Sequence, residues 1–446
     1  MKTTLCTVGG FDEVGRNMTS FTVGNETIIC DMGFDIKSLA LFEEQGNHRS
    51  SLTRETLIQQ NIIPDDSALH PLRSSVKMIA ASHAHLDHIG AIPYLSHHYP
   101  APVYGTPYTL AVLKNMLRDD NLQFSNQLKT VQPGEIVPIS KDLSVEFIHV
   151  THSTPQSSMI ALHTKKGVIL YATDFKFDDT PVIEDKPDYD KIKQLAEKRV
   201  IATVVDSLYS GTPESMPSEH VARDMLKNVL LDLDTNGHAI VATCFASNIA
   251  RLRSMIDIGN SLGRKVVFLG RSLMKYCNAA EEVGVAAYSK EVQLVPYPRN
   301  IRQVVSQIEK EGPENYFIVC TGGQGEPNSV FRRLVNPDHP FHFSPDDFAV
   351  FSNRVIPVEP NISNRADIEH RLKRLGVQVY PDVHVSGHCG GADIRKLVKI
   401  LNPEHIIPCH GDHTLLSPVT PIVEDMGYKL DKTLHFMHNG KTLSFE

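Results

Sequence analysis

Short apolar runs rich in β-branched residues alternate with helix-like stretches along the whole chain. Alternation of this kind predicts an α/β protein in which helices separate the strands. The strand candidates are residues 27–30, 78–81, 145–150, 168–173, 200–205, 239–243, 265–269, 316–320, 348–352 and 405–408. The helix candidates are residues 109–118, 191–197, 219–231, 249–262, 301–311, 366–375 and 392–401.

The rhythm of these elements changes along the chain. Residues 1–205 are richer in consecutive strand runs, as in antiparallel hairpins, whereas residues 208–365 repeat strand, loop and helix, as in a doubly wound parallel sheet. The final 80 or so residues are expected to return to strands. We therefore predict a first domain of residues 1–207 and 366–446 that carries an inserted second domain of residues 208–365.

The composition is that of an ordinary globular protein. Of 446 residues, 41% are hydrophobic and 22% are charged, which excludes a disordered or fibrous chain. No apolar run approaches the roughly 18 residues of a membrane helix, and the N-terminus has no signal-peptide core, so a cytoplasmic protein without a membrane partner is expected. The net charge of −8 argues against a surface built for nucleic-acid affinity. Bound divalent ions would nevertheless add local positive charge.

Cysteine and histidine usage narrows the candidate chemistry. The seven cysteines are an odd number, widely spread and without a Cys-x-x-Cys pair, which disfavours a disulfide framework or a thiolate zinc site. The 22 histidines are half as many as Lys and Arg together. Because His is the commonest metal ligand, this excess directs attention to histidine clusters.

The densest histidine cluster follows the strand candidate 78–81. Four ligand-type side chains lie within six residues, in the order His83, His85, Asp87 and His88. Exposed loop histidines are the simple alternative, but three imidazoles and a carboxylate at this spacing favour a metal site. One ion could not take all four side chains without strain, so two metals sharing the segment is the easier arrangement.

Other ligand-type residues follow the ends of distant strand candidates. In α/β sheets ligands collect outside the carboxyl ends of strands, so these residues are expected to meet at one edge. Each residue alone could equally well cap a turn, but together with the histidine cluster they favour a site. They are Asp31, His152, Asp174, Asp206 and His410.

The complete pattern resembles the ligand set of the metallo-β-lactamase fold. The resemblance implies that one zinc ion is held by His83, His85 and His152, that a second is held by Asp87, His88 and His410, and that Asp174 bridges the two. It gives Asp31 a supporting role beside the site. His and carboxylate ligands without thiolates suit zinc and tolerate manganese, and magnesium is a further alternative.

The long segment between Asp174 and His410 resembles the β-CASP nucleases. Asp206-Ser207, His388 and His410, which stands 22 positions after His388, carry this resemblance. The implied fold is α/β, a metallo-β-lactamase αββα sandwich with an inserted β-CASP domain. The chain is similar to the RNase J family in particular, in its archaeal form, over nearly its whole length, at residues 9–10, 15–18, 90–94, 173–178, 245–249, 270–272, 322–327 and 384–388.

The resemblance implies a metal-dependent ribonuclease. The expected activity is that of a 5′→3′ exoribonuclease that releases nucleoside 5′-monophosphates from single-stranded RNA, prefers a 5′-monophosphate end and forms a homodimer. Two cations lower the pKa of a shared water and offset charge on the phosphodiester. With Asp87 and Asp174, the implied catalytic residues are His388, the general acid, and Asp206, whose carboxylate favours the protonated imidazole.

Several loops that follow apolar strands are candidates for RNA contacts. Small residues let backbone N–H groups approach an anion, and an arginine can fork onto phosphate. No Walker-type G-x-x-x-x-G-K-[ST] motif occurs, which disfavours ATP hydrolysis. The resemblance places residues 384–388 near the 5′-monophosphate. The candidates are Ser247, Asn248, Arg271, Ser272, His384, Val385, Ser386, Gly387 and His388.

Four other readings of the sequence stay open. An endoribonuclease of the same family, similar to mRNA 3′-end processing enzymes, is disfavoured because no KH-like extension precedes Gly9. A DNA-directed relative is disfavoured because that branch usually has Val where His410 stands. An inactive RNA-binding protein would usually have lost ligands, and a small-molecule hydrolase does not need the long insertion.

Overall fold

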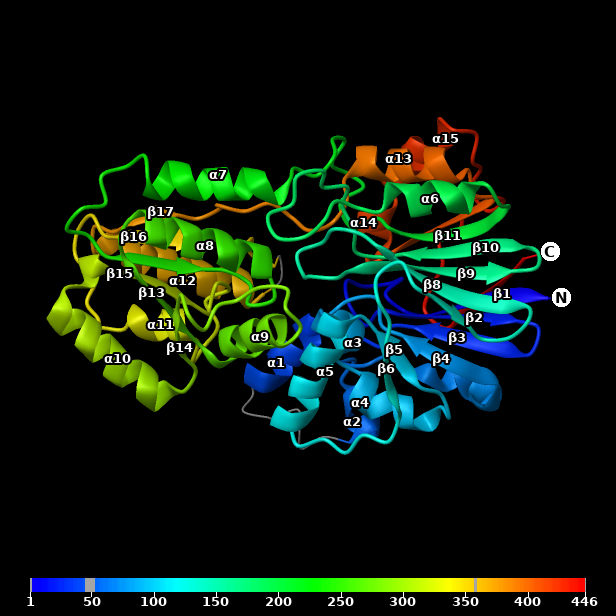
Figure 1. The fold of residues 1–446 in the computed structure, drawn as a ribbon, viewed down its shortest axis with the longest axis horizontal. Helices are drawn as coiled ribbons and strands as arrows, with labels where there is room; N and C mark the ends of the chain where they lie inside the picture. Colours follow the sequence, from blue (N-terminus) through cyan, green and yellow to red (C-terminus); the bar gives the residue numbers. More distant parts are fainter. Residues whose placement is uncertain (1, 45–52, 357–358, 446) are drawn as a thin grey trace. The chain divides into compact units, whose positions relative to one another are not determined.

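The computed structural model describes residues 2–44, 53–356 and 359–445. The chain divides into two compact units, shown in Figure 1. The first comprises Met1–Asp179, Asp185–Met216 and Gly387–Glu446, and the second comprises Thr180–Glu184 and Pro217–Ser386. The domain ranges inferred from the sequence stay a prediction. The structural units differ from them in placing residues 208–216 in the first unit and residues 180–184 and 366–386 in the second.

The first unit contains a seven-stranded sheet in the order β19-β1-β2-β3-β4-β5-β6. The strands from β19 to β3 pair antiparallel, whereas those from β3 to β6 pair parallel. The parallel half places the carboxyl ends of neighbouring strands at one edge, where ligands collect. The strands are β1 (Thr3–Gly9), β2 (Met18–Val23), β3 (Glu26–Cys30), β4 (Val76–Ala80), β5 (Val103–Gly105), β6 (Leu128–Thr130) and β19 (Lys441–Phe445).

A second sheet of the first unit has six strands in the order β18-β11-β10-β9-β8-β7. The strands from β7 to β10 form an antiparallel meander, and β10, β11 and β18 run parallel. The last strand joins only after the chain has passed through the second unit. The strands are β7 (Ile136–Pro138), β8 (Leu143–His149), β9 (Ser158–Thr164), β10 (Gly167–Ala172), β11 (Val200–Asp206) and β18 (His405–Cys409).

These two sheets pack face to face with helices outside them. Phe21 and Met78 of the first sheet share one apolar core with Phe147 and Tyr171 of the second. In Figure 1, α5 lies beside β5 and β6, while α6, α13 and α15 cover the second sheet. The layers form the αββα sandwich expected from the resemblance. The helices are α1 (Ile36–Glu44), α2 (Arg54–Gln59), α3 (Leu86–Ile89), α4 (Ile92–Leu95), α5 (Pro107–Asp119), α6 (Tyr189–Ala196), α13 (Gly391–Leu401), α14 (His413–Leu416) and α15 (Val419–Glu424), with 3₁₀ turns at Asp66–Ser75 and Ser96–His98.

The second unit is built on a six-stranded sheet in the order β14-β13-β15-β12-β16-β17, whose neighbouring strands pair parallel. The chain winds first towards β14 and then towards β17, as expected for a doubly wound insert. The strands are β12 (Ile240–Thr243), β13 (Lys265–Leu269), β14 (Gln293–Val295), β15 (Tyr316–Cys320), β16 (Phe348–Phe351) and β17 (Gln378–Tyr380). The helices are α7 (Glu219–Leu230), α8 (Ile249–Ser261), α9 (Arg271–Glu282), α10 (Pro298–Glu311), α11 (Val330–Leu334) and α12 (Asn361–Arg374), with a 3₁₀ turn at Pro313–Asn315.

Each strand and helix candidate of the sequence coincides with an element of the structure, with differences of a few residues at the ends. The final 80 or so residues contain β17, β18 and β19, as expected, and the predicted helices correspond to α12 and α13, but α14 and α15 between β18 and β19 were not predicted. Two of these helices, α14 and α15, are too short to show a helical period. In the described ranges, no helix is both long and apolar enough to cross a bilayer.

Candidate metal centre

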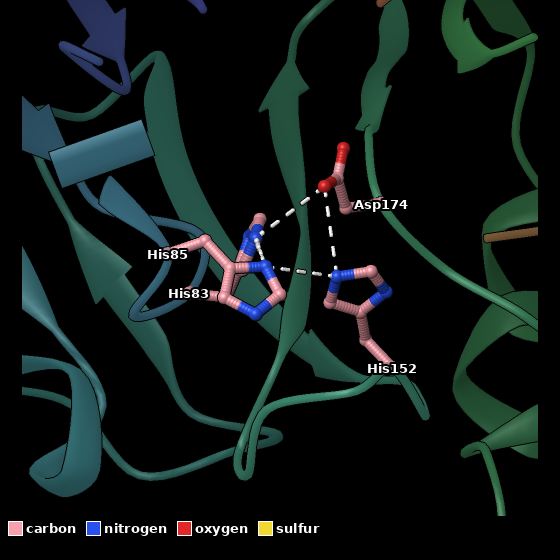
Figure 2. Close-up of side chains that lie close together, drawn as sticks. All are labelled: His83, His85, His152 and Asp174. Carbon is pink, nitrogen blue, oxygen red and sulfur yellow. Dashed lines mark hydrogen bonds and ion pairs between the residues drawn. The ribbon is translucent and has the colours of Figure 1, made fainter. Parts of the chain in front are cut away.

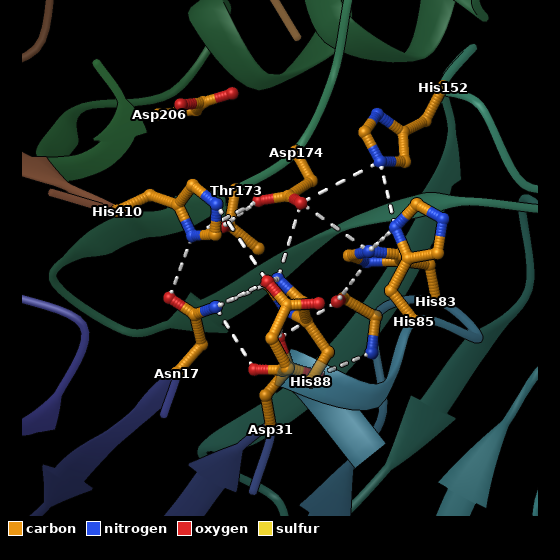
Figure 3. A network of polar contacts seen from close by, with 12 residues as sticks. Asn17, Asp31, His83, His85, His88, His152, Thr173, Asp174, Asp206 and His410 are labelled. Carbon is orange, nitrogen blue, oxygen red and sulfur yellow. Dashed lines mark hydrogen bonds and ion pairs between the residues drawn. The ribbon is translucent and has the colours of Figure 1, made fainter. Parts of the chain in front are cut away.

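The predicted ligands gather at the carboxyl ends of strands in the first unit, as Figure 3 shows. Asp31 follows β3, and the histidine motif follows β4 and enters α3. His152 lies beyond β8, Asp174 beyond β10 and His410 directly after β18. Because these five strands belong to the two packed sheets, residues far apart in sequence meet at one end of the sandwich.

Three of these strand ends have an unusual backbone. Asp31, Asp174 and His410 have φ angles of 60°, 45° and 70°. Residues other than glycine seldom adopt positive φ, and Asp and His are among those that do so most often. Such conformations persist where the surrounding structure enforces them, and they cluster at functional sites. The backbone therefore marks the same edge as the side chains do.

The first ligand group, drawn in Figure 2, consists of His83, His85, His152 and Asp174, whose ligand atoms all lie within 4.8 Å of one another. Nδ1 of His85 is 3.2 Å from Nε2 of His83 and 3.1 Å from Nε2 of His152. Oδ2 of Asp174 is 3.5 Å from Nε2 of His83 and 3.6 Å from Nε2 of His152. Three imidazole nitrogens and one carboxylate oxygen thus face a common point, as a tetrahedral cation requires.

Outer contacts determine which nitrogen each ring turns inward. Nδ1 of His83 lies 2.9 Å from Oγ of Ser82, which itself donates to Asp31. Nδ1 of His152 donates to the carbonyl oxygen of Gly387 at 2.8 Å. Nε2 is thereby left as the ligand atom of both rings, an arrangement typical of protein metal sites.

The second ligand group consists of Asp87, His88, Asp174 and His410. Nε2 of His88 is 3.2 Å from Oδ2 of Asp174 and 3.6 Å from Oδ2 of Asp87. Nε2 of His410 is 3.8 Å from Oδ2 of Asp87. Asp174 is common to both groups.

Asp31 belongs to neither ligand group but forms hydrogen bonds with residues around them. Its buried carboxylate accepts from the backbone N–H and the hydroxyl of Ser82, both at 2.8 Å, and from the hydroxyl of Tyr171 at 3.2 Å. It also lies 2.8 Å from Nδ1 of His88. This carboxylate therefore orients ligands of both groups.

A third group of Asp174, Asp206 and His388 lies beside the first two. Nδ1 of His388 donates to Oδ2 of Asp206 at 2.8 Å and lies 3.9 Å from Oδ2 of Asp174. Burial would lower the pKa of His388, but the carboxylates of Asp206 and Asp174 outweigh it and raise this pKa to about 9. The two carboxylates thus favour the protonated form of this imidazole.

The electrostatics of the first ligand group fit a divalent cation. Burial lowers the pKa of His83 and His152 and lowers that of His85 to about 3, so these imidazoles are neutral and offer lone pairs. Burial alone would raise the pKa of Asp174, but His410, His88 and His388 outweigh it and hold this pKa well below its usual range. The donor set of imidazoles and carboxylates, without thiolates, suits a divalent metal.

The candidate RNA contacts divide between the two units. Ser247, Asn248, Arg271, Ser272 and the 384–386 segment lie in the second unit, whereas Gly387 and His388 lie in the first. Asn248 is buried and its side chain caps α8 by accepting from the N–H of Arg251 at 3.0 Å. Arg271 and Ser272, at the start of α9, are exposed.

Sequence reasoning missed several residues that contact the candidate ligands or Asp31. They are Asn17 and Thr173, which Figure 3 labels, and also Ser82 and Tyr171. Two of them had a signal in the sequence, because Asn17 lies in a stretch that resembles the RNase J family and Ser82 directly precedes the first ligand.

Comparisons with known families agree with this geometry. The metallo-beta-lactamase superfamily matches residues 24–226, and the beta-CASP domain of Ribonuclease J matches residues 237–370. The Zn-dependent metallo-hydrolase RNA specificity domain matches residues 376–417, the segment that contains His388 and His410. The three matches together span both units.

Similar proteins cover the chain from end to end. A Ribonuclease J from Methanocaldococcus jannaschii is 40% identical over 100% of this chain and 99% of its own, and one from Pyrococcus abyssi is 37% identical over 97% and 95%. A crystal structure of a protein of unknown function from Enterococcus faecalis V583 has the same fold, with a TM-score of 0.64 at 16% identity over 100% of both chains. With its metallo-β-lactamase sandwich, β-CASP insert and near-complete coverage of these relatives, the chain belongs to the Ribonuclease J family.

Proposed function

We propose that the protein is a 5′→3′ exoribonuclease that hydrolyses single-stranded RNA to nucleoside 5′-monophosphates and prefers a 5′-monophosphorylated end. The broader activity, that of a metal-dependent ribonuclease, follows from the family and from a His/Asp cluster able to bind a divalent metal. The observation that supports the mechanism best is the His388–Asp206 pair beside Asp174, because it sets a proton donor next to the ligand groups.

In this proposal each ligand group would hold one cation, and Asp174, which belongs to both groups, would be a ligand for each. The family's usual metal, zinc, suits the imidazole-rich first group, and manganese or magnesium are alternatives for the same ligands. When bound, two divalent cations lower the pKa of a shared water and offset the charge that builds up on the phosphodiester. The first cation is assigned to His83, His85 and His152, and the second to Asp87, His88 and His410.

His388 is the proposed general acid that protonates the leaving 3′-oxygen. Its Nδ1 is occupied by Asp206, so Nε2 is left to carry the proton to the substrate. Asp206 is itself fixed, because its Oδ1 accepts from the N–H of Leu208 at 3.0 Å. The His388 side chain is 17% exposed, whereas those of His83, His88 and His410 are at most 2% exposed, so His388 is the more accessible to substrate.

Direction and step size require a contact to the 5′-phosphate near the centre. Gly387 precedes the general acid and its carbonyl oxygen accepts from Nδ1 of His152, which ties this backbone to the first ligand group. A Cβ at position 387 would lie 2.7 Å from the backbone nitrogen of Ser153, so only glycine permits this approach. A terminal phosphate held by the end of this loop, beside the first ligand group, would favour release of mononucleotides.

The test uses linear RNA labelled at a 5′-monophosphate and a circular RNA of the same sequence. Labelled mononucleotide should appear first from the linear RNA, and the circle should persist. Substrates with a 5′-hydroxyl or 5′-triphosphate should react more slowly than the monophosphate. Internal fragments at early times, or cleavage of the circle, would contradict the proposal and favour the endoribonuclease of the same family.

A homodimer, implied by the family resemblance, completes the proposal. Sedimentation equilibrium at micromolar concentration should give twice the chain mass of 49.6 kDa. A monomer mass under these conditions would contradict the proposed dimer but not the proposed ribonuclease reaction.

A further inference from the structure

Asn17 contacts two candidate ligands of the second group, as Figure 3 shows. The residue directly precedes β2, and it is 2% exposed. Its Nδ2 lies 2.9 Å from Nε2 of His88, and its Oδ1 lies 3.0 Å from Nδ1 of His410. One short side chain therefore joins two imidazoles that reach the centre from strand ends in different sheets.

A backbone contact fixes which way round the amide lies. Nδ2 of Asn17 donates to the carbonyl oxygen of Asp87 at 3.0 Å, a contact that the amide oxygen could not make. Oδ1 therefore faces His410. Because this oxygen only accepts, Nδ1 of His410 must carry the hydrogen, and the lone pair lies on Nε2, the nitrogen that faces Asp87.

His88 is held by a complementary set of contacts. Its Nδ1 lies 2.8 Å from Asp31, which leaves Nε2 facing Asp174 and the amide of Asn17. Asn17 thus contacts the inward-facing nitrogen of one ring and the N–H of the other. The two rings stack with centroids 5.6 Å apart, and Asn17 connects them at this separation.

The position of Asn17 is determined by its own surroundings. Its N–H donates to the carbonyl oxygen of Asp87 at 3.1 Å, and its carbonyl oxygen accepts from Gly33 at 3.1 Å. Gly10, with φ of 88°, passes so close that a Cβ there would lie 2.4 Å from Oδ1 of Asn17. The carbonyl oxygen of Gly10 also accepts from the N–H of His410 at 2.7 Å, so the loop, the amide and the ligand are tied together.

We propose that Asn17 is a positioning residue for the second cation. It holds His410 in the tautomer that presents Nε2 to the cation, and it sets the separation of His410 and His88. The inference rests on the metal centre of the proposed function. Partners that orient a ligand in this way typically change metal affinity by about 10–100-fold.

The experiment measures zinc binding and does not depend on activity. The full-length protein is stripped with a chelator and titrated in zinc-buffered solutions, and bound zinc per chain is determined by mass spectrometry. The wild-type chain should bind two ions. Asn17→Ala and Asn17→Ser should bind the first with unchanged affinity and the second about 10–100-fold more weakly. Asn17→Asp, which keeps an acceptor for Nδ1 of His410, should retain the second ion.

Asn439→Ala is the matched control. Asn439 holds the same β1–β2 loop from its other side, with Oδ1 accepting from Phe11 at 3.1 Å and Nδ2 donating to Glu13 at 2.9 Å. It belongs to neither ligand group, so both ions should bind to this variant as in the wild type. Equal weakening of the second site in Asn439→Ala and Asn17→Ala would overturn the inference, because loop stability alone would explain it.

Two further results would also overturn it. If Asn17→Ala and Asn17→Ser each bind both ions with wild-type affinity, only the inference about Asn17 fails. A wild-type chain that binds fewer than two ions would contradict the two-cation centre itself and the inference with it. As a spectroscopic check, ¹⁵N spectra of the imidazoles should show Nδ1 of His410 protonated in the wild type and a tautomer mixture in Asn17→Ala.

Discussion

At the residue scale, one carboxylate connects every part of the candidate centre. Oδ2 of Asp174 is 3.2 Å from Nε2 of His88, 3.5 Å from Nε2 of His83 and 3.9 Å from Nδ1 of His388. Its Oδ1 accepts from the hydroxyl of Thr173 at 2.9 Å. Asp174 is 1% exposed and therefore cannot exchange its partners for water, which makes the relative positions of both ligand groups and the acid depend on one side chain.

Replacing His388 by Ala should lower kcat by about 10²–10⁴-fold, the usual contribution of a positioned general acid. The zinc content should stay at two ions, because His388 is outside the two ligand groups assigned to the cations. Single-turnover cleavage of labelled RNA and metal analysis check both parts. His149→Ala, at the end of β8 and outside the ligand groups, is the control and should retain activity. A lost ion in His388→Ala would show instead that His388 binds metal.

Glu146 provides a pH-dependent prediction away from the centre. Its carboxylate, 3% exposed, lies 2.8 Å from both Nζ of Lys191 and Nε2 of His163. Burial raises its pKa, but these two partners outweigh burial and lower it below 4.5. A carboxyl with a lowered pKa in the folded state stabilises above its unfolded pKa, and this stabilisation is lost as pH falls through the folded pKa.

Glu146→Gln should therefore lower the free energy of unfolding by about 2 kcal/mol at pH 7. The difference from the wild type should shrink below pH 4.5, where the carboxyl of the wild type also becomes neutral in the unfolded state. Urea unfolding of both proteins at pH 7 and pH 4 measures this difference in the free energy of unfolding. Since metal loss at low pH affects both proteins alike, an unchanged difference at the two pH values would contradict the explanation.

The role of a single residue can be predicted from the sequence only where a local pattern of residue types indicates it. The candidate ligands are His and Asp residues that follow strand candidates, so the sequence predicts that they meet at one edge of the sheets. The roles of Asn17 and Tyr171 did not, because their partners are 71 and 140 positions away, and only the folded sheets bring them together. The positive φ angles of Asp31 and His410 likewise arise from tertiary contacts that no local pattern encodes.

At the element scale, the length of an element explains part of what the sequence predicts. Long buried strands such as β11 and long amphipathic helices such as α10 have enough residues to show a period, and both were predicted. Strands β5, β6, β7 and β14 have three residues each, and helix α3 has four, too few for a periodic signal. Pairing with a neighbouring strand forms the four short strands, so propensity alone does not identify them.

A buried ion pair joins elements of the second unit and supports a test there. Arg251 of α8 is 0% exposed, and it donates to both carboxylate oxygens of Glu219 in α7, at 2.5 Å and 3.0 Å. Its Nη1 donates to Oγ of Ser352 after β16 at 2.7 Å and to the carbonyl oxygen of Val383 after β17 at 3.2 Å. Arg251 thus connects a helix pair to two strand ends.

Arg251→Met should destabilise the second unit by about 3–5 kcal/mol, because it leaves the carboxylate of Glu219 buried without its charged partner. Arg253→Met, in the same helix but with a partly exposed side chain, should cost at most about 1 kcal/mol. Chemical unfolding of the two variants measures the difference. Adding Glu219→Leu should restore part of the stability lost in Arg251→Met, and equal effects of the two arginine variants would contradict this account.

At the scale of the whole molecule, the chain forms two units of different chemistry. The first unit is interrupted in sequence by the second. Strand β18, the last strand of its six-stranded sheet in the sequence, follows the interruption and is followed directly by His410. The three groups of possible metal ligands found in the described residues all belong to this unit. The second unit has an apolar core of its own between its parallel sheet and its helices. The two units are therefore expected to respond differently to the loss of metal.

Calorimetry of the full-length protein, with and without a chelator, tests this difference. A cation at about 1,000 times its Kd stabilises the unit that binds it by about 4 kcal/mol, which corresponds to a rise in Tm of about 10 °C for a unit of this size. Chelation should thus lower the Tm of the first unit and leave that of the second unchanged, and zinc should reverse the change.

Two variants serve as controls. Arg251→Met identifies the transition of the second unit by shifting it alone. Asp174→Asn should abolish the response to the chelator because both ligand groups lose their shared carboxylate. Equal shifts of both transitions would show that the cations stabilise the chain as one cooperative body, and no shift in the wild type would show that the centre does not bind metal.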